Sequence, residues 1–69
     1  MADIGIGNVG RFMRLRARAR EYREKAEWEM AENALHDAET LCSERGFPNA
    51  EHYKLAILVE LAEVTRRHN

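Results

Sequence analysis

RGFPNA, at residues 45–50, is the stretch that decides how this chain folds. Before it, residues 11–45 contain neither glycine nor proline and consist mainly of good helix formers. Gly46 suits the left-handed conformation that ends a helix, and Pro48 prevents the helix from continuing. Asn49 suits the N-cap of a second helix that runs to about residue 67. The sequence therefore predicts an all-α helical hairpin: a long N-terminal helix, a Gly-Phe-Pro-Asn turn and a shorter second helix.

The ends and size of the chain limit its organisation. Residues 1–10 hold three of the four glycines and predict a flexible N-terminal arm or a frayed helix start, which leaves residues 11–69 as a single helical-hairpin domain. The sequence has no apolar run of membrane-spanning length and no signal-peptide core. Cys42 is the only cysteine, so no intrachain disulfide is possible. These features favour a cytoplasmic protein.

The apolar stripe changes direction within the long helix. Residues 12–26 place apolar side chains on one narrow stripe, and residues 28–42 place them on a broader one. On helical geometry the two stripes differ by about a third of a turn. A straight helix cannot direct both toward one neighbour, so it either breaks near Glu24–Glu27 or packs its halves against different partners. Because no glycine or proline marks a break, the sequence favours different partners.

Helix lengths predict self-association. A helix of roughly 37 residues is about 55 Å long and one of roughly 18 residues about 27 Å, so the second helix covers only half of the first. The second helix also has two apolar faces, one around Ile57 and Leu61 and the other formed by Leu55, Leu58, Val59 and Ala62. We expect a homo-oligomer, most simply an antiparallel dimer of hairpins that forms a four-helix bundle. The alternative is a monomeric bundle in which the basic half bends back as a third helix. The residues expected in the core or the oligomer interface are Phe12, Leu15, Tyr22, Trp28, Leu35, Leu41, Tyr53, Ile57, Leu61 and Val64.

Seven of the eleven Lys and Arg side chains lie between residues 11 and 25. They are Arg11, Arg14, Arg16, Arg18, Arg20, Arg23 and Lys25. Residues 1–25 carry these seven bases against three acids, whereas residues 26–63 carry two bases against nine acids. The N-terminal half of a helix favours acids, and Arg14 and Arg18 repel each other at i,i+4. Helix stability does not select this arrangement, so we expect the basic segment to bind an acidic partner.

Three kinds of acidic partner fit the basic segment. The first is an acidic protein surface, on its own subunit or on another protein. The second is nucleic acid, bound without sequence preference because Asn8 is the only Asn or Gln near the segment. The third and less favoured is a membrane surface, because half of the apolar side of the segment is alanine. Our hypothesis is a self-associating regulatory protein that binds an acidic protein, with nucleic-acid binding as the alternative.

The sequence predicts neither a metal site nor a catalytic site. Glu29, Glu32 and His36 share one helical face, but it lies opposite the apolar stripe and lacks the Glu-x-x-His spacing of di-iron bundles. Cys42 and Ser43 have no glycine-rich elbow or strand-edge loop that would hold a nucleophile. We therefore expect a protein that is not an enzyme and that uses no cofactor, metal or small-molecule substrate.

Overall fold

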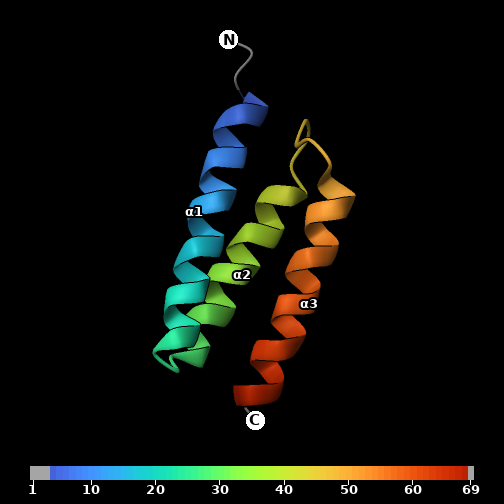
Figure 1. Cartoon of the computed structure of the whole chain (residues 1–69). Helices are drawn as coiled ribbons and strands as arrows, with labels where there is room; N and C mark the ends of the chain where they lie inside the picture. The colour runs from blue at the N-terminus through green and yellow to red at the C-terminus, as the bar shows by residue number, and fades with distance from the viewer. Residues whose placement is uncertain (1–3, 69) are drawn as a thin grey trace.

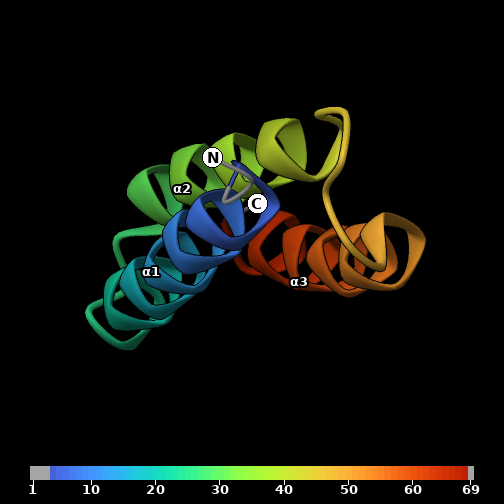
Figure 2. The ribbon, with the colours of Figure 1, turned by 90° about the horizontal axis from the view of Figure 1, so that it is seen from above.

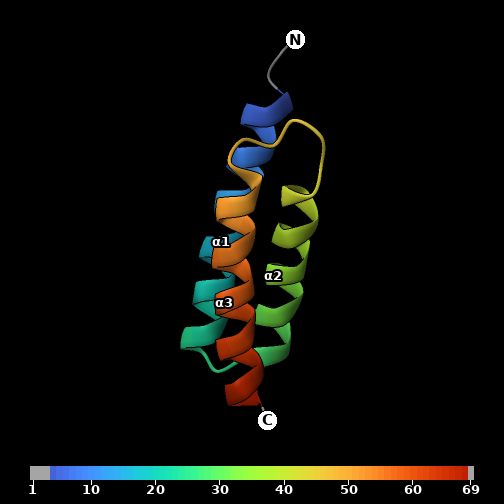
Figure 3. The same cartoon turned by 90° about the vertical axis from the view of Figure 1, so that its right-hand side faces the viewer.

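The structure is a computed structural model that describes residues 4–68, with side chains described from residue 7. It contains three helices, α1 (Ile4–Glu24), α2 (Trp28–Cys42) and α3 (Ala50–His68). Consecutive helices run antiparallel, and α2 packs against both α1 and α3 (Figures 1 and 3). Figure 2 shows that the helices do not form one layer, because α2 lies to one side of α1 and α3. The described chain is an all-α three-helix bundle.

The predicted long helix, and with it the two-helix hairpin, is wrong. The helix breaks at residues 25–27, where Ala26 adopts a positive φ of 59°. The Glu27 N–H donates to the Tyr22 carbonyl at 2.8 Å, and the Ala26 N–H donates to the Arg23 carbonyl at 3.0 Å. These two bonds form a Schellman motif, in which Ala26 takes the position that glycine usually occupies. The break explains why the apolar stripe changes direction. It lets the apolar sides of α1 and α2 face the same core.

The N-terminal turns of α1 belong to the bundle. The helix begins at Ile4, so residues 4–10 are helical, although we predicted a flexible arm there; residues 1–3 lie outside the described residues. Val9 packs against the core. The Asn8 side-chain amide donates to Glu44 Oε1 at 3.2 Å, which ties this end of α1 to the turn between α2 and α3.

That turn, residues 43–49, supplies an aromatic side chain to the core. Gly46 has a φ of 86°, the left-handed conformation predicted for it. Phe47 is buried, and its ring centroid lies 5.5 Å from that of Phe12 and 5.9 Å from that of Tyr53. Phe12 and Tyr53 are themselves 5.0 Å apart. This cluster joins α1, the turn and α3.

The core consists of apolar side chains from all three helices and the turn. The buried side chains are Phe12, Ala19, Ala31, Ala34, Leu35, Ala38, Leu41, Cys42, Phe47, Ile57, Leu61 and Val64. Leu15, Tyr22, Trp28 and Tyr53 are partly buried and pack against this core. The basic half of the predicted long helix therefore lies along the bundle and does not overhang it. Among the described residues, no helix is both long and apolar enough to cross a bilayer.

Candidate functional site

Two of the seven clustered cations form partly exposed ion pairs with acids of the same bundle. Arg16 Nη2 lies 2.6 Å from Glu60 Oε2, and Arg23 Nη2 lies 2.8 Å from Glu63 Oε1. Both acids belong to α3, so the two pairs bridge α1 and α3. The Arg16 guanidinium also lies 5.8 Å from the centre of the Phe12 ring. Part of the basic segment is thus neutralised by the acidic part of the same chain.

The second group of cations faces solvent on another side of α1. Arg11, Arg14 and Arg18 are exposed and, together with Leu15, line a hollow of about 320 Å³, which we call the arginine hollow. None of the lining residues is acidic, and none of the three arginines forms an ion pair with a described residue. Because they lie three and four residues apart on one helix, their charges repel one another. Lys25, just after α1, is also exposed.

A neighbouring groove between α1 and α2 shares two residues with the arginine hollow. Leu15 and Arg18 line both, and Tyr22, Met30 and Asp37 are among the other residues of the groove. The surface therefore changes from a hollow lined mainly by arginines to a more apolar groove, which has an acid, Asp37, on its α2 side. A ligand that spans both would need an acidic part followed by an apolar part.

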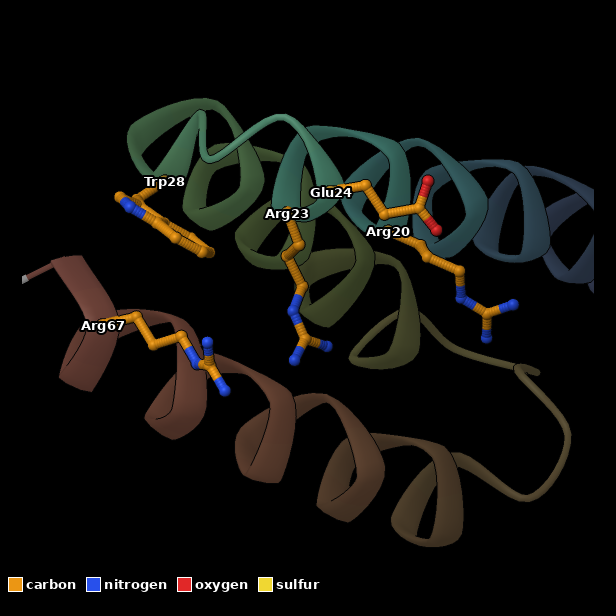
Figure 4. Close-up of a pocket in the computed structure, with 5 residues that line it drawn as sticks. All are labelled: Arg20, Arg23, Glu24, Trp28 and Arg67. Carbon is orange, nitrogen blue, oxygen red and sulfur yellow. The ribbon is translucent and has the colours of Figure 1, made fainter.

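The third group of cations lies at the end of the bundle where the α1–α2 turn meets the C-terminal part of α3. Arg20, Arg23, Glu24, Trp28 and Arg67 line a hollow of about 360 Å³ there. Figure 4 shows the Trp28 ring reaching toward α3, with the guanidinium groups of Arg23 and Arg67 pointing into the space between α1 and α3. Trp28, predicted as a core or interface residue, is half-buried at the rim of this hollow.

Arg67 is a site residue that the sequence analysis did not select. It follows Glu63 by four residues and Glu60 by seven, which places it on the side of α3 that faces α1. This spacing could have identified Arg67 as a neighbour of the basic segment. The inference also needs the knowledge that α1 lies next to α3. Arg20 and Arg67 form no ion pair with a described residue.

The chemistry available at these surfaces is anion binding. Guanidinium groups donate paired hydrogen bonds to carboxylates and phosphates, and Trp and Arg are enriched among the residues that dominate protein interfaces. Among the described residues, no group of three His, Cys, Asp or Glu side chains could hold a metal ion. Cys42 is buried, and its burial raises the pKa of the thiol, which keeps the thiol protonated.

The outward side of α3 is a separate, apolar surface. Leu55, Leu58 and Val59 are 65%, 44% and 66% exposed, and neither α1 nor α2 covers them. Of the two apolar faces predicted for this helix, the one with Ile57, Leu61 and Val64 is buried and the other remains in solvent.

Comparisons with protein-family models, with curated proteins and with solved structures find no match for this chain. The assignment of a function therefore depends on the surfaces described above.

Proposed function

We propose that this chain is a small non-enzymatic interaction protein that binds an acidic segment of another protein through the arginine hollow. One observation carries this proposal: Arg11, Arg14 and Arg18 surround a single hollow that no acid lines. The repulsion between the three guanidinium groups destabilises α1, and no described acid forms an ion pair with any of them. Carboxylates from a partner relieve that repulsion and accept charge-assisted hydrogen bonds.

The charge of the surroundings favours a short acidic protein segment over nucleic acid. Duplex DNA carries one negative charge per about 1.7 Å, so it extends well past the hollow. Next to the hollow it would meet Asp37 in the adjoining groove, on a chain whose net charge is −1. A peptide that has acids at one end and an apolar residue after them places its acids on the arginines. Its apolar residue then contacts Leu15, Tyr22 and Met30.

The proposal includes self-association through the outward side of α3. Contiguous exposed apolar side chains on a small protein mark association surfaces. Leu55, Leu58 and Val59 form such a group, and none of them belongs to the core of the bundle. Two copies joined in this way would present two arginine hollows to a partner with repeated acidic segments, which raises the overall affinity.

A fluorescence-anisotropy titration tests the arginine hollow. The probe is a labelled peptide of glutamates followed by a leucine, and the variant is Arg11→Gln/Arg14→Gln/Arg18→Gln. We expect its affinity to fall at least about tenfold, because hydrogen bonds to charged groups contribute about 1.5–3 kcal/mol each. The matched control, Lys25→Gln/Arg45→Gln/Lys54→Gln, loses the same net charge outside the hollow and should change affinity less than about threefold by screened electrostatics alone.

Two results would refute this assignment. Equal losses in both triple variants would show that only net charge matters. Tighter binding of a short DNA duplex than of the peptide, with affinity that falls steeply as salt rises, would establish the nucleic-acid alternative instead.

A further inference from the structure

A stripe of residues on the outward side of α3 has positions that are spaced symmetrically along the helix. Glu51, Leu55, Leu58, Val59, Ala62 and Arg66 are exposed and form one stripe along it, which the exposed side chains of His52, Lys54 and Thr65 flank. The separations along the chain are 4, 3, 1, 3 and 4 residues, so the stripe is symmetric about the midpoint between Leu58 and Val59. The chemistry is apolar in the middle, with an acid at one end and a base at the other.

We propose that a second copy of the chain packs on this stripe with its α3 antiparallel to the first. Reversing one copy places Leu58 opposite Val59 of the other copy and Leu55 opposite Ala62 of the other copy. It also places Glu51 opposite Arg66 of the other copy, at both ends of the interface. A parallel arrangement would instead bring Glu51 against Glu51 and Arg66 against Arg66. Opposite charges at the ends therefore select the antiparallel direction.

The charged ends of the stripe are available to pair with a second copy. Glu51 and Arg66 are exposed, and neither forms an ion pair with a described residue. The stripe is about 22 Å long, with its apolar residues in the middle and its charged residues at the rim, which is the usual arrangement of a protein interface. Ile57, Leu61 and Val64 are buried inside the bundle, so association on this side leaves the core of each copy closed.

The proposal rests on the self-association included in the proposed function, and it adds the direction and the register. Glu51 in the first turn and Arg66 in the last turn also interact favourably with the helix dipole. The test must therefore separate pairing between copies from an effect within one helix.

Distances between spin labels test direction and register. The labels are placed on His52→Cys and, in a second protein, on Thr65→Cys, both in a Cys42→Ala background. Each position lies equally far from the centre of the stripe. With antiparallel helices about 9 Å apart, both pairs of Cα atoms should be about 21 Å apart. A parallel dimer would give about 10 Å for both pairs, and a shifted antiparallel register would give two unequal distances.

Charge reversal tests the end pairs by sedimentation equilibrium. Glu51→Arg or Arg66→Glu alone should raise the dissociation constant of the dimer about tenfold, because each removes two attractive contacts and creates two repulsive ones. The double variant should restore the constant to within about threefold of the original by the same pairing argument. Arg67→Glu is the control, since it perturbs the helix dipole equally but lies on the α1 side of α3.

The outcomes distinguish the two proposals. A chain that stays monomeric at millimolar concentration overturns both self-association and this interface. A dimer with unequal or short label distances, or one that the double reversal does not restore, overturns the antiparallel register while self-association stands.

Discussion

The substitution Phe12→Ala tests whether α1 is part of the folded core. Phe12 is fully buried, and its ring contacts those of Phe47 and Tyr53. Replacing a buried Phe by Ala costs about 3–5 kcal/mol, and the loss should lie in the upper half of that range because aromatic pairs contribute about 0.5–1.5 kcal/mol each. At about 0.05–0.15 kcal/mol per residue, the whole chain has about 3–10 kcal/mol of stability. The variant should therefore lose at least about two fifths of the free energy of unfolding of the original chain.

Urea unfolding, followed by far-UV circular dichroism and by the fluorescence of Trp28, measures this loss. The control is Met13→Ala, the next residue of α1, whose side chain is exposed and which should change stability by less than about 0.5 kcal/mol. If Phe12→Ala does not fold at all, Phe12→Leu keeps most of the volume and should cost about 1–2 kcal/mol through the lost ring contacts. A loss below about 1 kcal/mol for Phe12→Ala, or one equal to that of Met13→Ala, would refute the docking of α1.

Three further predictions concern other parts of the bundle. Ala26→Gly should raise the thermal midpoint by about 2–5 °C, because glycine adopts a positive φ without the strain that alanine has there; a lower midpoint in thermal unfolding would contradict the Schellman turn. A double-mutant cycle of Arg16→Ala and Glu60→Ala should give a coupling of about 0.5–1 kcal/mol that shrinks in about 1 M salt, and a coupling insensitive to salt would argue against an ion pair. Burial raises the pKa of the Cys42 thiol, so alkylation should be slow in the native protein and fast in urea. Since the unfolded thiol ionises near its ordinary value of 9.0 and the folded thiol only above it, stability should fall as pH rises through that range, and this loss should be absent in Cys42→Ala.

The features that could be predicted from the sequence are those that single side chains decide. The helical content follows from propensity, and the positive φ of Gly46 follows from its lack of a Cβ. The exposed face with Leu55 was predicted because one helix cannot bury two opposite sides in a small bundle.

The break at Ala26 could not be predicted from local signals. Alanine favours helix and has no preference for a positive φ. The only signal was the rotation of the apolar stripe, which a straight helix with two partners satisfies equally well. Packing within one chain decides between a broken helix and a straight helix with two partners. The break lets Phe12 and Ala19 enter the same core as Leu35 and Ile57.

The division of the basic segment also depends on that break. Counting charges cannot distinguish Arg16 and Arg23, which pair with α3, from Arg18, which faces solvent. Their roles follow from which side of α1 meets α3, and that is fixed only once the chain turns at Ala26. Arg67 was missed for the same reason, since its neighbours on α1 come from the other end of the sequence.

The turn at Ala26 is stable only while α1 stays packed against the rest of the bundle. Residues 24–28 consist of helix-favouring side chains, and holding an alanine in the left-handed region costs about 1–2 kcal/mol. Nothing local offsets this cost except the two bonds that close the turn, so the burial of α1 must outweigh it. We therefore expect that a variant that loses this burial favours a continuous helix through residues 24–28, with α1 detached from the core. The strained turn at Ala26 therefore depends on the aromatic contacts of Phe12, which hold α1 against the core.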